Sequence, residues 1–267
     1  MQASALQDLV IAAAPSDCCL TGYPHTGTAR GTFVSIADIN TYIARPPRKE
    51  QEKRVILYFP DVWGIDEFQN GQLLCDYFAA NGFLVLALDY FQGDSLAAYR
   101  KKNPDPNIPV TTLPGFNFEA WKAKHKAFAK LAVPRWIEAV KLQFGAPKVI
   151  LLLSNPINNT HRHAKHEIRL REAASVTASA RQTDHAFPVE ARRRAEALLV
   201  ERAQQLAEAD DVKNNEEAKE RLKFQFQLFS GVQHGFALRG DMRDAWQRYA
   251  KEESAAGIVR WFKMFMD

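Results

Sequence analysis

The sequence predicts an α/β fold in which a mostly parallel sheet carries helices on both faces. Three apolar runs support this prediction, because each run is continuous rather than alternating and so fits a strand buried on both faces. The runs are VILYFPD (55–61), FLVLALDYF (83–91) and KVILLLS (148–154). Stretches with the apolar spacing of helices separate them, and strands that alternate with helices favour a parallel sheet.

The elements around the first two strands are predicted from periodicity and turn residues. Residues 31–44 alternate apolar and polar positions about a polar break, which is typical of an antiparallel hairpin at a sheet edge. A helix is expected over residues 67–82, with Gly82 ending it. Residues 92–120 are rich in Pro, Gly and Asn and predict a long loop over the sheet, of a kind that often forms a functional lid.

The second half of the chain continues the alternation of helices and strands. Residues 120–145 have a helical pattern that Pro134 interrupts, so that either one broken helix or two helices end to end are expected. The elements expected after it are a short strand over SVTASA (175–180), a helical segment (189–223), a strand over FQFQLFSG (224–231) and an amphipathic closing helix (245–266). No internal repeat is present, and we expect a single domain over residues 1–267.

Composition and charge exclude several classes of protein. Of the 267 residues 46% are apolar, and the formal net charge is only +4, without a basic stripe and interleaved aromatic residues that would indicate nucleic-acid binding. No apolar run approaches the roughly 20 residues that cross a bilayer, and the N-terminus lacks the basic segment of a signal peptide. The three cysteines are too few for a disulfide framework and fit a reducing compartment. We therefore expect a cytoplasmic monomer or weak homodimer that binds neither nucleic acid nor a membrane.

Polar residues follow several predicted strands and are expected at one rim of the sheet, where open parallel sheets bind ligands. They are Asp61, Asp89, Asp184 and His234. Asp184 precedes His234 by 50 residues (234 − 184), and each lies on a loop after a strand. An acid followed by a histidine is the order in the triads of α/β hydrolases, where the acid fixes the tautomer of the base. The spacing fits equally well an aspartate that caps a helix and a histidine that contacts backbone.

Four segments of the chain carry a family resemblance. They are DCCLTGYPHTGTARGTF, YFPDVWGIDEFQNGQLLCDYFAANGFLVLALDYFQGD, TDHAFPVEARRRAEALL and FQLFSGVQHGFALRGD. Together they resemble the dienelactone hydrolase family, especially its fungal branch, over residues 17–147 and 180–267. The resemblance implies an α/β-hydrolase fold, a small-molecule lactone or carboxylic ester as substrate, and no metal or other cofactor.

The family uses a Cys-His-Asp triad, and the resemblance assigns two of its three members. Asp184 matches the triad acid and His234 the base. The N–H of Val62 matches the oxyanion donor, because it follows the acidic residue after the first core strand. That residue is Asp61 here, where bacterial members usually carry Glu. Arg239 lies close to a family arginine that contacts an anionic substrate.

The cysteine of the triad has no counterpart in this chain. In the family it stands on an elbow similar to Gly-Tyr-Cys-x-Gly, directly after the strand that follows FGAP, and this strained turn needs small residues. Here no glycine occurs between Gly145 and Gly231, and no cysteine follows Cys75. Residues 148–179 are therefore interpreted as an atypical segment in place of the nucleophile elbow.

The other candidate nucleophiles are disfavoured by their surroundings. Ser154 ends the third strand, but its neighbours are bulky or turn-forming, and Pro156 lacks an N–H for an oxyanion hole. Cys75 falls on the apolar stripe of a helix and is predicted to be a small core residue. Cys18 and Cys19 match family residues near the N-terminus, where a structural role is favoured.

The atypical segment leaves three hypotheses about function. From the expected elbow near Ile157 to Asp184 there are 27 residues (184 − 157). This is fewer than the family places between its elbow and its acid, where a helix and another strand fit, so that one buried helix is expected to be missing or rebuilt. The protein is then an impaired hydrolase, a non-catalytic protein that binds a small acid or a partner protein at the same rim, or an incorrect gene model of an active hydrolase. No metal site is predicted, because the nearby histidines lack Cys or carboxylate partners at ligand spacing; these are His161, His163 and His166.

Overall fold

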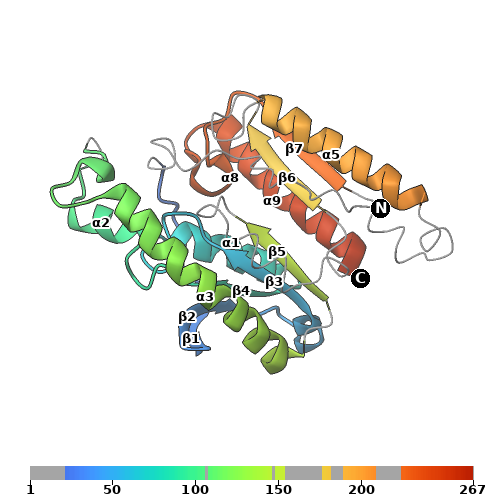
Figure 1. The fold of residues 1–267 in the computed structure, drawn as a ribbon, viewed down its shortest axis with the longest axis horizontal. Helices are drawn as coiled ribbons and strands as arrows, with labels where there is room; N and C mark the ends of the chain where they lie inside the picture. The colour runs from blue at the N-terminus through green and yellow to red at the C-terminus, as the bar shows by residue number, and fades with distance from the viewer. Residues whose placement is uncertain are drawn as a thin grey trace, which may run out of the picture.

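A five-stranded sheet forms the centre of the protein (Figure 1). The structure is a computed structural model that describes residues 22–105, 108–145, 148–153, 176–181, 189–208 and 224–266. The strands, in spatial order, are β1 (Thr32–Ile36), β2 (Ile39–Ala44), β4 (Leu84–Leu88), β3 (Arg54–Phe59) and β5 (Lys148–Leu153). Strand β3 pairs in parallel with β4 and β5, whereas β2 is antiparallel to β1 and β4. The hairpin predicted over residues 31–44 is confirmed, and β1 lies at the sheet edge.

Two further strands form a separate parallel pair, β6 (Val176–Arg181) and β7 (Phe224–Phe229). Both strands contact α9 (Ala245–Met266), as Figure 1 shows. The strands predicted over 175–180 and 224–231 are therefore present, but the expected sheet is divided in two in the described part of the chain. Their sequences VTASAR and FQFQLF mix apolar with small or polar residues, unlike the continuous runs of β3 to β5.

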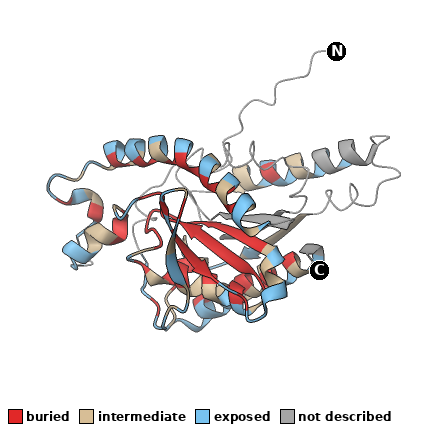
Figure 2. Cartoon of the chain, turned by 90° about the horizontal axis from the view of Figure 1, so that it is seen from below, coloured by how far each residue is buried: buried red, intermediate tan, exposed pale blue. Residues whose placement is uncertain are grey.

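Helices cover both faces of the five-stranded sheet, as predicted. The other helices are α1 (Gln69–Ala80), α2 (Leu96–Lys102), α3 (Phe118–Phe144), α5 (Val189–Glu208) and α8 (Phe236–Arg239). Val55 and Leu57 of β3 pack in one core with α3, whereas Ile56 and Tyr58 pack in the other with α1 and α9. Each of these four side chains is at most 1% exposed, which explains why the apolar run is continuous. Figure 2 shows the buried strands in red between helices above and below them.

The prediction of an irregular loop over residues 92–120 is wrong in part. This segment contains α2 and a 3-10 turn at Val110–Thr112, and α3 already begins at Phe118. Leu96 is fully buried and Ala97 is 5% exposed, so that the first turn of α2 is held by apolar contacts in the core beneath it. The Pro and Gly residues of the segment obscured this short helix in the sequence.

The interruption expected at Pro134 is also absent, because α3 continues through it. Proline removes one intrahelical hydrogen bond. Val133, Trp136 and Ile137 beside it are nevertheless 0% exposed, and this packing holds the helix together. Among the described residues, no helix is long and apolar enough to cross a bilayer.

Candidate functional site

A buried ion pair joins the loop after β3 to the segment after β7. Asp61 is 4% and Arg239 3% exposed, and Arg239 Nε donates to Asp61 Oδ2 at 3.0 Å. The other carboxylate oxygen of Asp61 accepts from the Trp63 N–H, also at 3.0 Å. The fold thus brings together two predicted site residues that lie 178 positions apart in the chain.

Burial and pairing shift the pKa of the Asp61 carboxyl in opposite directions. Loss of water is the larger effect and raises the pKa of Asp61 above its ordinary value of 3.8. The guanidinium of Arg239 and the N–H of Trp63 oppose this rise, and so does the charge of His234. His234 itself precedes Arg239 by five positions (239 − 234), between β7 (Phe224–Phe229) and α8.

His234 lies in the turn between β7 and α8, and the glycine that follows it has two structural roles. Gly235 has φ 79° and ψ 9°, a left-handed conformation that glycine adopts without steric cost. A Cβ atom at this position would lie 2.7 Å from Cζ of Arg239. Gly235 therefore both forms the turn that carries the half-buried His234 and leaves room for the guanidinium.

Val62 supplies a buried N–H next to Asp61. The residue is 1% exposed, and its carbonyl accepts from the Leu96 N–H at 3.0 Å. Within the described part of the chain, no group accepts a hydrogen bond from the Val62 N–H. Buried N–H groups are nearly always paired, so this donor has the property that an oxyanion hole requires.

Several predicted residues lie outside the part of the chain that the structure describes. Asp184 and Ser154 are among them, so the Asp184–His234 pair and the Ser154 nucleophile stay predictions. The same holds for Cys18, Cys19, the three histidines at 161, 163 and 166, and most of the atypical segment 148–179. Cys75 is described, and its predicted core position is confirmed: it is 0% exposed, and burial raises the pKa of its thiol well above the ordinary value. Among the described residues, no group of three or more His, Cys, Asp or Glu could hold a metal ion.

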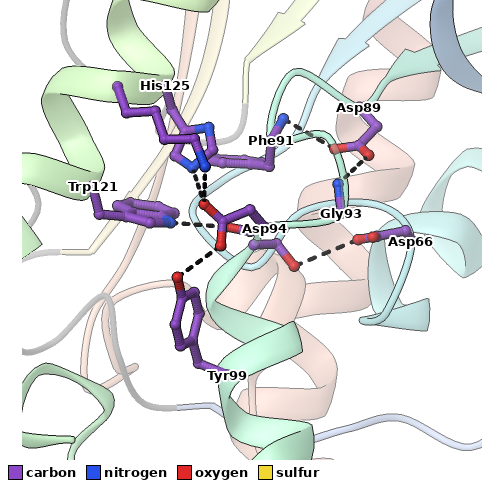
Figure 3. A network of polar contacts seen from close by, with 10 residues as sticks. Asp66, Asp89, Phe91, Gly93, Asp94, Tyr99, Trp121 and His125 are labelled. Atoms are coloured by element: carbon purple, nitrogen blue, oxygen red, sulfur yellow. Dashed lines mark hydrogen bonds and ion pairs between the residues drawn. The ribbon is translucent and has the colours of Figure 1, made fainter. Parts of the chain in front are cut away.

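Asp89, expected at the same rim, belongs to a different network (Figure 3). Its carboxylate accepts from the Phe91 N–H at 3.0 Å and from the Gly93 N–H at 2.8 Å, which closes the turn after β4. Burial, and secondly the charge of Asp66, raises the pKa of Asp89 to about 6. In the structure Asp89 is therefore a turn-forming residue.

Asp94, which no sequence pattern indicated, anchors the segment after this turn. Its carboxylate accepts from Lys124 Nζ at 2.6 Å, from Tyr99 OH at 2.7 Å and from His125 Nε2 at 3.0 Å (Figure 3). Trp121 Nε1 donates to the Asp94 carbonyl at 2.7 Å. The network ties α2 to α3, and His125 is 0% exposed and so is shielded from any substrate. The members lie up to 31 positions apart without a recognisable spacing, so no sequence signal marked them.

Comparisons with known proteins identify the family of this chain. The model of the dienelactone hydrolase family matches residues 39–150. A protein named dienlactone hydrolase 2 from Gibberella moniliformis is 32% identical over 258 residues, which cover 96% of this chain and 98% of that protein. Dienlactone hydrolase 1 from the same fungus is 27% identical, with 98% of each chain covered.

Solved structures show the same fold at low sequence identity. A dienelactone hydrolase-like promiscuous phosphotriesterase from metagenomic libraries has a TM-score of 0.54 and 13% identity, covering 90% of this chain and 99% of that one. A cold-adapted esterase from an Arctic intertidal metagenomic library has a TM-score of 0.51 and 9% identity, covering 92% and 98%. The protein thus has an α/β-hydrolase fold, and by its sequence relatives the chain belongs to the dienelactone hydrolase family.

Proposed function

We propose that the protein hydrolyses a lactone or a small carboxylic ester, and that the missing elbow cysteine impairs its turnover. The buried Asp61–Arg239 pair, with His234 on the turn that precedes α8, is the observation that carries this proposal. His234 would act as general base and Asp184 would orient it. The Val62 N–H would stabilise the oxyanion, and Arg239 would bind an anionic group of the substrate.

The proposal is tested with p-nitrophenyl acetate and a dienelactone as substrates. We expect slow turnover that falls by roughly 10²–10⁴-fold on His234→Ala, because that substitution removes general-base assistance. Cys75→Ala serves as the control, since this buried thiol should contribute nothing to turnover. Loss of turnover on Ser154→Ala would identify the serine as a substitute nucleophile. Turnover that survives His234→Ala unchanged would contradict the proposal.

A non-catalytic binding protein is the second candidate. It is favoured by the absence of any cysteine after Cys75 and of any glycine between Gly145 and Gly231. Without its nucleophile a triad retains at most weak catalysis from positioning and the oxyanion hole. Calorimetric binding of maleate that Arg239→Ala abolishes, in a protein without turnover, would support this candidate.

The third hypothesis, an incorrect gene model, is tested separately. Sequencing the transcript gives the codons for residues 148–179 directly. A message that encodes these residues in frame would exclude a retained intron or a frameshift. A message that encodes a Gly-Tyr-Cys-x-Gly elbow instead would restore the complete triad to the natural protein.

A further inference from the structure

Three consecutive carbonyls at the end of α8 accept hydrogen bonds from a distant part of the chain. They belong to residues 238–240, which include the site arginine. Asn70 Nδ2 donates to the first at 3.0 Å, the Tyr23 N–H to the second at 3.1 Å, and His25 Nε2 to the third at 2.9 Å. Since a carbonyl only accepts, Nε2 of His25 carries the proton in this contact. The donors come from the segment before β1, residues 22–25, which we call the strap, and from the first turn of α1.

Asn70 links the strap to α8 through all the polar atoms of its side chain. It is 2% exposed, its Oδ1 accepts from the His25 N–H at 2.8 Å, and its Nδ2 also donates to the Tyr23 carbonyl at 2.8 Å. The two donor hydrogens and the acceptor of the amide are therefore all used. In Asn70→Asp a carboxylate oxygen would replace Nδ2. It would then face the carbonyl oxygens of Tyr23 and Leu238, and two acceptors would meet at each contact.

The strap supplies the outside contacts that α8 needs to be stable. This helix has only four residues, and a single turn is too short to be stable without outside contacts. The strap also lies directly against Arg239, because a Cβ at Gly22 would fall 2.7 Å from Cβ of Arg239. The position of the arginine backbone therefore depends on the strap, and the reach of the guanidinium to Asp61 depends on that backbone.

We propose that Asn70 is a positioning residue for Arg239. By holding the strap against residues 238–240 it keeps the guanidinium paired with Asp61 and thereby in place for an anionic group of the substrate. The last part rests on the proposed function, whereas the placement of the guanidinium can be measured without any turnover. Asn70 acts only through Arg239 and contacts no reacting atom in this scheme.

The direct test is the hydrogen exchange of the Arg239 Nε–H, measured by NMR and assigned by the loss of its signal in Arg239→Lys. In Asn70→Asp this exchange should become roughly tenfold faster, because the guanidinium is no longer held in its buried pair. Gln72→Glu is the matched control: Gln72 lies on the same helix, is 8% exposed, and donates to the carbonyls of Ile65 at 2.7 Å and Asp66 at 3.1 Å.

Both variants lose buried amide bonds and should lower Tm by a few degrees, but Gln72→Glu should change the Arg239 exchange by less than about twofold. Equal acceleration in the two variants, or none in a folded Asn70→Asp, would overturn the proposal. His25→Phe removes only the bond to the Gly240 carbonyl and serves if Asn70→Asp does not fold. It should also accelerate the exchange, and an unchanged rate in a folded His25→Phe would count against the proposal.

Measurements of KM connect the position of the Arg239 guanidinium to the proposed binding of an anionic substrate. Asn70→Asp should raise KM for mono-p-nitrophenyl succinate, an anionic ester, by roughly tenfold, and KM for p-nitrophenyl acetate by less than about twofold. An equal rise for both esters would indicate a general structural defect and would overturn the proposed role toward the anion. If the unmodified protein hydrolyses neither ester, the proposed hydrolase function fails, and the exchange measurement still decides the role of Asn70.

Discussion

Gly235→Ala tests why a glycine follows the candidate base. The first cost is conformational, because a Cβ at φ 79° adds roughly 1–2 kcal/mol. The second is the displacement of Arg239, whose Cζ would lie 2.7 Å from the new Cβ. Since Arg239 and Asp61 are paired at 3.0 Å with side chains only 2% and 5% exposed, moving the guanidinium breaks a buried ion pair, which costs about 3–5 kcal/mol. The expected total loss of unfolding free energy is about 4–7 kcal/mol.

Gly231→Ala is the matched control in the same loop region. Gly231 also has a left-handed φ, 66°, but the nearest atom to its added Cβ is Nε1 of Trp246 at 3.7 Å, an ordinary contact. This variant should lose only the conformational part, about 1–2 kcal/mol. Urea unfolding followed by tryptophan fluorescence gives both values, and their difference is the contribution of the displaced Arg239.

Repeating Gly235→Ala in an Arg239→Ala protein separates its conformational cost from the cost of displacing Arg239. In Arg239→Ala the guanidinium atoms that the new Cβ would meet are gone, so adding Gly235→Ala should cost no more than Gly231→Ala does. Equal losses for Gly235→Ala and Gly231→Ala in the unmodified background would refute the reasoning. That result would mean that the guanidinium moves aside without losing Asp61.

The remaining predictions concern pH, the Asp94 network and the missing elbow. Because the pKa of Asp89 is about 6 in the folded protein and 3.8 is its ordinary value, its contribution to stability falls by roughly 3 kcal/mol as pH rises from about 4 to about 6. Asp89→Asn should lack this fall, and parallel urea-unfolding profiles of the two proteins across that range would contradict the assignment. Tyr99→Phe removes one donor to the Asp94 carboxylate and should cost about 1–3 kcal/mol of unfolding free energy, whereas an unchanged urea midpoint would show that the bond adds nothing. Replacing residues 148–179 with a family-like segment that carries a Gly-Tyr-Cys-x-Gly elbow should raise ester hydrolysis by roughly 10²–10⁴-fold and lose the gain on His234→Ala. A folded chimera whose thiol reacts with iodoacetamide but which hydrolyses nothing would show that His234 is not the base.

The elements predicted correctly are those whose pattern follows from burial alone. All five residues of β4 are 0% exposed, and burial on both faces is what a continuous apolar run indicates. The failures occur where tertiary packing outweighs a local signal. Pro134 marks a helix break by its own chemistry, but the buried Trp136 and Ile137 keep α3 continuous.

The candidate site shows more clearly that tertiary contacts cannot be predicted from local sequence patterns. Resemblance to a family indicated Asp61, Val62 and Arg239 one by one, but no pattern in the sequence pairs residues 178 positions apart. Asn70 gave no signal, because an asparagine at the start of a helix is ordinary. Its partners lie 45, 47 and 168 positions away, so only the folded chain reveals what it holds.

The Asp61–Arg239 pair is weak evidence for stability, and we propose that it serves to bind an anionic group. Taking two charges out of water costs several kcal/mol for each ion, and apolar replacements of similar volume are often neutral or stabilising. The same dry surroundings strengthen the attraction between a guanidinium and a substrate anion. In the proposed function, hydrolysis and non-catalytic binding would both use this guanidinium, whereas only hydrolysis would need a nucleophile. Under this proposal, the absence of the elbow cysteine would affect the step that follows binding and would leave the Asp61–Arg239 pair in place.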